Sequence, residues 1–270
     1  MNHVNLQQIL QATIAIVERA GVLLAAECVR PGGRRGFGDK AEVDVEIETQ
    51  LRAELLAILG CDWWGEETGH ALTGNDWCWV VDPNDGTSDF LKGLKGSAIS
   101  VGLLHMNQPV LGVVHAPVTP SGKSDCIAWA KGMKHLLRNG DQVAADLSDQ
   151  TLREDTPVMV SAAADGKPEI NTGLCAPSGF HAMPSIAYRL ARVAAGDGVC
   201  GISLYPISAH DVVAGHALLI GAKGVLVGED GTSIEYVTES SMARVSGRVF
   251  GGAPLACADL SSRDWNRVFG

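Results

Sequence analysis

Apolar residues recur at helical spacing in two stretches near the start of the chain. Across residues 4–28 they fall three or four positions apart, with Gln, Glu and Arg between them, which predicts a long amphipathic helix. The same spacing predicts a second helix over 43–59, followed by a glycine stop. The stretch RPGGRRGFGD (30–39) contains five Gly and Pro residues and predicts a loop.

Short apolar runs predict a group of strands in the middle of the chain. WCWVV (77–81) is typical of a buried strand, whereas DWWGEETG (62–69) predicts a turn after a short apolar patch. The runs at 97–104 and 109–118 flank a polar turn and predict a hairpin, and the sheet is expected to continue through 125–132 and 135–139.

The second half of the chain alternates strand and helix signals instead. Strands are predicted at 157–163, 198–203 and 224–229, with helices at 184–196 and 210–224 between them. This contrast predicts an α+β subdomain over 1–143 and an α/β subdomain over 157–270, joined by a polar, aperiodic linker at 144–156.

Composition limits the classes of function. A hydrophobic fraction of 46% with 19% charged residues is typical of a globular enzyme, and a net charge of -10 argues against binding to a nucleic-acid polymer or a membrane surface. The seven cysteines show no C-x-x-C spacing, and no apolar stretch suggests a membrane span or a leader. We therefore expect a cytoplasmic protein without disulfides.

Three acids crowd into the eight positions 82–89 without a Lys or Arg among them. The segment VVDPNDGT places Asp82 at the mouth of a strand, and Gly86 and Thr87 where a helix could start with free backbone amides. Such a cluster is either a solvated turn or a cation site, because close carboxylates repel each other. Oxygen ligands without His or Cys favour Mg²⁺ over zinc.

Acids elsewhere in the chain strengthen the cation-site hypothesis. Glu66 and Glu67 follow an apolar patch in a turn, and Asp211 lies at the predicted start of a helix. Taken alone, Asp211 suits a helix N-terminus because of the helix dipole. All three segments lie where strands end or helices begin, which is where sites are built.

The segments GEE (65–67), DPNDGTSDF (82–90) and HDVVAG (210–215) resemble the ordered signature G-E-E, D-P-x-D-G-T-x-x-F and W-D-x-A-A-G of the inositol monophosphatase superfamily. The resemblance extends over nearly the whole chain. It implies a layered α-β-α-β-α sandwich and Mg²⁺-dependent hydrolysis of a small phosphate monoester.

The resemblance also implies roles for individual residues. Two or three Mg²⁺ ions would be held by Glu66, Asp82, the main-chain carbonyl of Asn84, Asp85 and Asp211. The amides of Gly86 and Thr87 would bind phosphate. Asp44, which opens a D-x-x-x-E-x-x-L pattern, would orient the attacking water together with Thr87, and Glu66 would contribute to catalysis. Relatives commonly form homodimers, so a homodimer is a further expectation.

Several positions depart from the family pattern. His210 replaces a tryptophan, Ala41 replaces a Ser or Thr, and Pro184 replaces a glycine ahead of Ser185. We expect the change at His210 to alter packing above the site rather than metal ligation. Leu204 stands where inositol-specific members carry a glutamate, which argues against a dedicated inositol pocket.

The sequence leaves the substrate open between a nucleotide 3′-phosphate and an inositol or sugar phosphate. Ser185 and Arg189, one helical turn apart, are either substrate-binding or a polar pair on a helix surface. Arg34 and Arg35 are either a mobile lid over phosphate or solvated loop residues. The alternative to an enzyme is a family member that binds metal and anion with lost or residual phosphatase activity.

Other hydrolytic mechanisms lack their motifs. The spacing D-x-x-D at 82–85 differs from the D-x-D-x-T pattern of aspartyl-nucleophile phosphatases. The chain also has neither G-x-x-x-x-G-K-[ST] nor G-x-S-x-G, which argues against a P-loop triphosphatase and a serine hydrolase.

Overall fold

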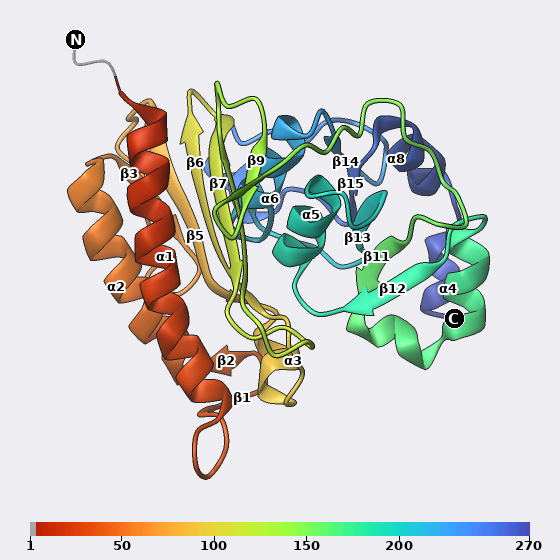
Figure 1. Cartoon of the computed structure of the whole chain (residues 1–270), viewed down its shortest axis with the longest axis horizontal. Coiled ribbons are helices and arrows are strands. Elements are labelled where there is room, and N and C mark those ends of the chain that lie inside the picture. Colours follow the sequence, from red (N-terminus) through yellow and green to blue (C-terminus); the bar gives the residue numbers. More distant parts are fainter. Residues whose placement is uncertain (1–3) are drawn as a thin grey trace.

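The computed structural model describes residues 4–270 and begins with two helices packed side by side (Figure 1). They are α1 (Leu6–Cys28) and α2 (Glu42–Ile58), within two residues of the predicted bounds. The loop between them contains the short strands β1 (Gly36–Phe37) and β2 (Lys40–Ala41), which pair with each other. The prediction of a loop over 30–39 was therefore wrong for residues 36–37, which form β1.

The first sheet follows these helices and has the strand order β10-β9-β8-β7-β6-β5-β3-β4 within residues 4–270. The predicted hairpin is confirmed as β6 and β7, with Met106 and Asn107 at positive φ in the turn. The strands are β3 (Asp62–Gly65), β4 (His70–Ala71), β5 (Trp77–Asp85), β6 (Ala98–His105), β7 (Gln108–Ala116), β8 (Asp125–Ala130), β9 (Leu136–Arg138) and β10 (Asp141–Val143).

Two strands at the site differ from the prediction. Residues 62–65, expected in a turn, form β3 because they pair in parallel with β5, a long-range partner that local pattern does not reveal. β5 continues past Val81 to Asp85, and its pairing with β6 shifts register between Asp82 and Asp85. Pro83 lies within this irregularity, where a missing backbone donor is tolerated.

The second half contains a sheet with the order β12-β11-β13-β15-β14, in which β11 pairs in parallel with β12 and β13. The predicted alternation of strand and helix is confirmed between β11 and β14. The strands are β11 (Val158–Ser161), β12 (Phe180–Met183), β13 (Cys200–Ser203), β14 (Val225–Gly228) and β15 (Val249–Gly252). The helices are η1 (Ala162–Gly166), α4 (Pro168–Cys175), α5 (Ile186–Ala194), α6 (Ala209–Gly221), α7 (Glu239–Ala243), α8 (Pro254–Ser261) and η2 (Trp265–Val268).

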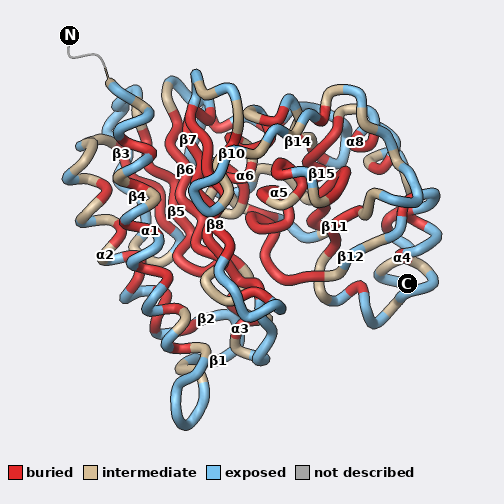
Figure 2. Tube along the Cα trace, viewed as in Figure 1, coloured by how far each residue is buried: buried red, intermediate tan, exposed pale blue. Residues whose placement is uncertain are grey.

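These elements form layers, as the resemblance implied. α1 and α2 cover one face of the first sheet, while α5 and α6 lie between the two sheets (Figure 1). Buried residues concentrate in the central strands and in the middle helices (Figure 2). One apolar cluster includes Val80 and Trp129 of the first sheet together with Leu190 and Leu218 of α5 and α6. The two sheets therefore share a core through the middle layer.

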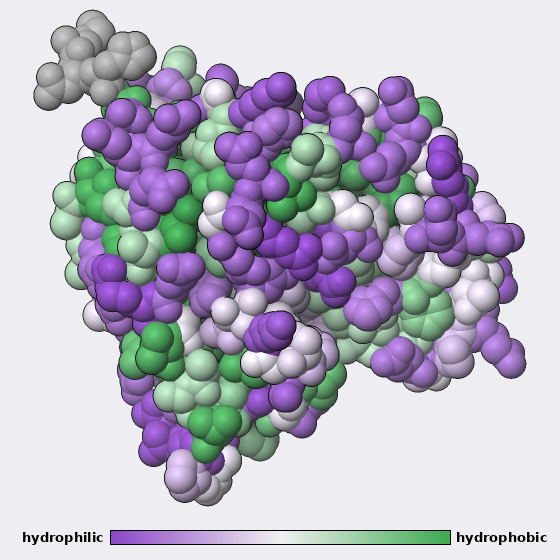
Figure 3. All heavy atoms as spheres, in the orientation of Figure 1, coloured by the Kyte–Doolittle hydropathy of each residue, from purple (hydrophilic) through white to green (hydrophobic). Residues whose placement is uncertain are grey.

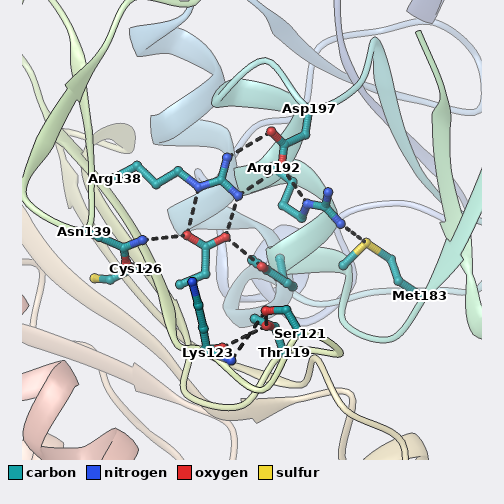
Figure 4. A network of polar contacts seen from close by, with 11 residues as sticks. Thr119, Ser121, Lys123, Cys126, Arg138, Asn139, Met183, Arg192 and Asp197 are labelled. Carbon is teal, nitrogen blue, oxygen red and sulfur yellow. Dashed lines mark hydrogen bonds and ion pairs between the residues drawn. The ribbon is translucent and has the colours of Figure 1, made fainter. Parts of the chain in front are cut away.

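A polar network also joins the two halves (Figure 4). Arg138 of β9 donates to both carboxylate oxygens of Asp125, at 2.9 and 2.7 Å, and to Asp197 at 2.9 and 3.0 Å. Asp197 also accepts from Arg192 of α5 at 2.7 Å, and the Tyr188 hydroxyl donates to Asp125 at 2.7 Å.

Whether 1–143 and 157–270 are separate folding units, with 144–156 as a linker, stays a prediction.

Helix α1 corrects the expectation that no apolar stretch of the sequence suggests a membrane span. It is the one helix of the described chain that is long and apolar enough, by length and composition, to cross a membrane. Its residues Leu10, Val17 and Leu24 are nevertheless fully buried, in the core that the helix shares with the first sheet. On the face seen in Figure 3, hydrophobic residues form small groups among many hydrophilic ones. The buried side of α1 therefore belongs to the core of the first sheet.

Candidate active site

Acids from three separate segments meet at one edge of the first sheet. Asp82, Asp85 and Asp211 each offer a carboxylate oxygen within 4.8 Å of the others. Glu66 and Asp82 form a second such group with His210. Asp82 belongs to both groups, so the two candidate cation sites are adjacent.

The pairing of β3 with β5 explains how Glu66 reaches this edge. The two strands run parallel, so their carboxyl ends meet at the same edge of the sheet. β3 ends at Gly65, and the Glu66 amide donates to the carbonyl of Val81 at 3.2 Å. The predicted position of Glu66 in a turn at a strand end is confirmed.

Asp211 comes from the first turn of α6. Its carboxylate accepts from the Ser208 amide at 2.6 Å, as part of a capping box. The expectation that it is a helix-terminal residue is confirmed. Because one oxygen of the same carboxylate lies within 4.8 Å of oxygens of Asp82 and Asp85, a cap and a cation ligand are compatible at this position.

Asp44 lies beside Thr87, as the family resemblance implied. The Thr87 hydroxyl lies 3.0 Å from Asp44 Oδ2 and 2.8 Å from the carbonyl oxygen of Asn84. The side-chain amide of Asn84 donates to Asp44 Oδ1 at 3.0 Å, while its Oδ1 is buried and has no hydrogen-bond partner in residues 4–270. Ala41 is the N-cap residue of α2 and makes no side-chain cap, so Asn84 and Thr87 hold the Asp44 side chain.

Asp85 is held by the start of α5. Its Oδ2 accepts from the Ser185 hydroxyl at 2.6 Å and from the Ala187 amide at 2.5 Å. Ser185 has φ 62°, an uncommon conformation for a residue with a side chain. Gly86 faces it with φ +94°, and a Cβ there would lie 3.0 Å from the Ser185 nitrogen. A glycine is therefore required where β5 meets α3 (Thr87–Leu91).

Arg189 is a buried cation behind the acids. Its guanidinium donates to the carbonyl of Ser185 at 3.1 Å and also to the carbonyl of Ile202. Burial lowers the pKa of Arg189 to about 10, whereas Asp85, Asp89 and Asp211 act to raise it. The hydrogen bonds of Ser185 and Arg189 to protein groups suit residues that position the site.

The acids destabilise one another's charged forms. Burial raises the pKa of Asp82 well above its usual range, and the neighbouring Glu66, Asp85 and Asp211 raise it further. Burial and nearby carboxylates also raise the pKa of Glu66 and Asp85. Burial raises the pKa of Asp44 to about 7, and it lowers that of His210 to about 4. A site that concentrates carboxylates in this way is suited to a cation.

The structure adds residues that the sequence left without a role. Glu48 is buried and accepts from the amides of Glu67 and Thr68 at 2.8 and 2.7 Å, so it fixes the turn that carries Glu66. In the sequence analysis Glu48 had only one use, as the glutamate of the D-x-x-x-E-x-x-L pattern that Asp44 opens. The Asn84 side chain and His210 were likewise missed as site groups, since their importance depends on which elements meet.

The loop arginines lie elsewhere. Arg34 donates to the carbonyls of Phe90 and Leu94. Arg35 lies among Glu27, Glu42 and Glu46. In this structure both residues anchor the loop rather than cover the acids, which differs from the lid and from the solvated-loop hypotheses alike.

Comparison with known proteins agrees with this geometry. The sequence model described as "Inositol monophosphatase family" matches residues 5–255. The chain belongs to this family. The expected fold and the class of reaction, phosphate-ester hydrolysis, are those of its named members.

Individual relatives match different shares of the chain. An inositol-1-monophosphatase of Mesorhizobium japonicum is 30% identical over 217 residues, which are 73% of this chain and 75% of that protein. The 3'(2'),5'-bisphosphate nucleotidase CysQ of Salmonella typhimurium is 26% identical over 63% of this chain and 67% of its own length. A probable inositol 1-monophosphatase, ImpA of Mycobacterium tuberculosis, is 41% identical over 86 residues, and that match covers only 32% of either protein.

Solved structures share the fold over nearly the full length. The inositol monophosphatase from Anabaena superposes with a TM-score of 0.72 at 24% identity, covering 96% of this chain and 95% of that one. The extragenic suppressor protein suhB from Bartonella henselae gives 0.76 at 18% identity, with 94% and 97% covered. At such identities the similarity establishes the layered fold alone.

Proposed function

We propose that this protein hydrolyses a small phosphate monoester in a reaction that requires Mg²⁺. The observation that carries the proposal is the meeting of Glu66, Asp82, Asp85 and Asp211 beside the Gly86–Thr87 turn. Family membership supports the reaction class. Each side-chain ligand position of the family pattern is occupied by Asp or Glu, which favours an active enzyme over a member that only binds metal and anion.

The residues present fit divalent cations. Asp82, Asp85 and Asp211 offer three oxygens within 4.8 Å of one another, and Asn84, whose carbonyl is the further expected ligand, directly precedes Asp85. Burial opposes the charge on these carboxylates, and a bound cation would relieve that cost. Bound Mg²⁺ would supply a lowered pKa for a water molecule and positive charge for the phosphoryl and leaving-group oxygens.

The protein's own groups would orient and deprotonate the attacking water. In the proposed step the water donates to the Thr87 hydroxyl, which in turn donates to Asp44 Oδ2, 3.0 Å away. The proton thus reaches Asp44 while the water oxygen forms its bond to phosphorus and the bond to the leaving oxygen breaks. Asn84 keeps Asp44 oriented through its 3.0 Å hydrogen bond.

The amides of Gly86 and Thr87 would bind the phosphoryl group, as the resemblance implies. The positive φ of Gly86 turns the chain from β5 into α3, where the first helical hydrogen bond runs from Phe90 to Gly86 at 2.9 Å. We assign to Ser185 and Arg189 the positioning of Asp85 and of α5, in addition to the predicted role next to substrate.

A cavity lined in part by the loop between β13 and α6 supports a nucleotide among the candidate substrates. It has a volume of about 360 Å³ and lies at the carboxyl ends of β11 and β13, with Leu204, Tyr205 and Phe269 in its wall. The Tyr205 and Phe269 rings pack edge to face at 5.6 Å. From Leu204 the chain leads within seven residues to Asp211. Such a wall suits a planar, partly apolar leaving group better than a polyol.

Phosphate release from a panel of esters tests the proposal. The panel should contain a nucleoside 3′-phosphate, an inositol phosphate and a sugar phosphate, each assayed with Mg²⁺ and with EDTA. We expect Mg²⁺-dependent turnover, highest kcat/KM for the nucleotide, and its loss in Asp85→Asn. Asp259→Asn is a matched control, because Asp259 is exposed, pairs with Arg263 and lies outside both acidic groups. Turnover that survives EDTA would refute the metal-dependent reaction.

A further inference from the structure

His210 lies in the acidic site and has no role in the reaction proposed above. It is the second residue of α6, and one of its ring nitrogens lies within 4.8 Å of carboxylate oxygens of both Glu66 and Asp82. Its side chain is 16% exposed, so water has little access to it. This arrangement would offer a metal ion one nitrogen ligand and two oxygen ligands.

The ring lacks the protein partners that would explain its burial. Its Nδ1 is buried and has no hydrogen-bond partner within the described residues 4–270. Its Nε2 lies 3.8 Å from Asp211 Oδ2, which is beyond hydrogen-bonding distance. Buried polar atoms nearly always have a partner, and an unpartnered one is explained by a bound ion or a bound water molecule.

The helix that carries His210 is held firmly against the first sheet. The His210 carbonyl accepts from the Ser100 hydroxyl of β6 at 3.3 Å. Gly102 of β6 lies so close to Val213 and Ala214 that a Cβ there would overlap both. A metal ligand on a helix that packs this tightly is already positioned before a cation binds, which favours binding.

We propose that His210 is a nitrogen ligand of the divalent ion held by Glu66 and Asp82, and that this position selects a transition metal such as Mn²⁺ or Co²⁺ over Mg²⁺. Imidazole nitrogen binds such ions better than Mg²⁺, which prefers oxygen. The neighbouring group of Asp82, Asp85 and Asp211 offers only oxygens and keeps its suitability for Mg²⁺. This inference rests on the proposed metal site and makes the two adjacent positions chemically different.

Pulsed electron paramagnetic resonance of the Mn²⁺-loaded protein tests the inference directly. Coordination by imidazole gives the bound Mn²⁺ a nitrogen-14 hyperfine coupling that an all-oxygen site lacks. We expect this coupling in the unmodified protein and its loss in His210→Phe. By calorimetry, His210→Phe should weaken Mn²⁺ and Co²⁺ binding about tenfold or more. Mg²⁺ binding should change by less than about threefold, because Mg²⁺ gains little from a nitrogen ligand.

Two further variants keep the result interpretable. His210→Gln provides a second, polar replacement in case His210→Phe does not fold. His135→Gln, between β8 and β9, removes a histidine outside both metal-binding groups and should leave the coupling intact. Mn²⁺ that binds without nitrogen coupling would overturn the inference and leave the proposed function standing. A protein that binds neither Mn²⁺ nor Mg²⁺ would instead overturn the proposed function as well.

Discussion

At the scale of single residues, the site depends on side chains held by very few partners. Asp44 is fully buried, and its carboxylate accepts hydrogen bonds from the Thr87 hydroxyl and the Asn84 side-chain amide. Burial raises its pKa to about 7, near the pH at which such an enzyme would work. A residue in this environment suits proton transfer better than structural support.

Asp44→Asn should therefore abolish most activity while the fold persists. We expect kcat to fall by about 10²- to 10⁴-fold, the contribution typical of a positioned proton acceptor. The free energy of unfolding, measured by urea denaturation, should stay the same or rise, because a buried ionisable group is removed. Asp39→Asn, on the exposed loop before α2, is the control. Equal activity in both variants would exclude Asp44 from the reaction.

At the scale of elements, the turn after β3 is set by a contact between helix and strand. Glu48 of α2 accepts hydrogen bonds from the amides of Glu67 and Thr68, and Gly65 leaves the room that this carboxylate occupies. A Cβ at Gly65 would overlap the Glu48 carboxylate and the Trp63 indole nitrogen. The position of Glu66 thus depends on a glycine one residue before it.

Gly65→Ala should displace this turn and weaken metal binding at Glu66. We expect a loss of about 1–3 kcal/mol in the free energy of unfolding, as for other overpacked sites, together with weaker Mn²⁺ binding by calorimetry. Gly60→Ala is the matched control, since the nearest atom to a Cβ there is the Leu56 carbonyl oxygen at 3.8 Å. The account of this turn fails if both variants bind Mn²⁺ equally well.

The sequence pattern predicts elements formed by neighbouring residues and misses those that depend on distant partners. Local spacing predicted α1, α2 and the hairpin of β6 and β7, because each is formed by neighbouring residues. It missed β3, whose parallel partner β5 lies beyond β4 in the chain, and it stopped β5 at Val81. It also assigned His210 to packing, since no local pattern shows that α6 brings this ring to Glu66.

At the scale of the whole molecule, the two sheets are tied together by the network of Figure 4 as well as by α5 and α6. Arg138 is the central cation of this network, paired with both Asp125 and Asp197. The Asp125 side chain is 7% exposed, so loss of its partner would leave a buried charge. The network holds α5, and through Ser185 it supports the position of Asp85.

Arg138→Ala should destabilise the protein strongly. We expect about 3 kcal/mol of lost unfolding free energy, the scale for breaking one side of a buried ion pair. Lys223→Ala removes the exposed pair with Asp146 and should change stability by less than about 0.5 kcal/mol. Urea denaturation of both variants makes the comparison, and similar losses would show that the network has no special part in joining the sheets.

Anomalous diffraction from crystals grown with Mn²⁺ and inorganic phosphate tests the central claim most directly. The account predicts one anomalous peak among Asp82, Asp85 and Asp211, a second peak beside Glu66 and His210, and phosphate against the amides of Gly86 and Thr87. Mn²⁺ peaks that avoid Asp82, or phosphate bound away from the Gly86–Thr87 turn, would contradict it.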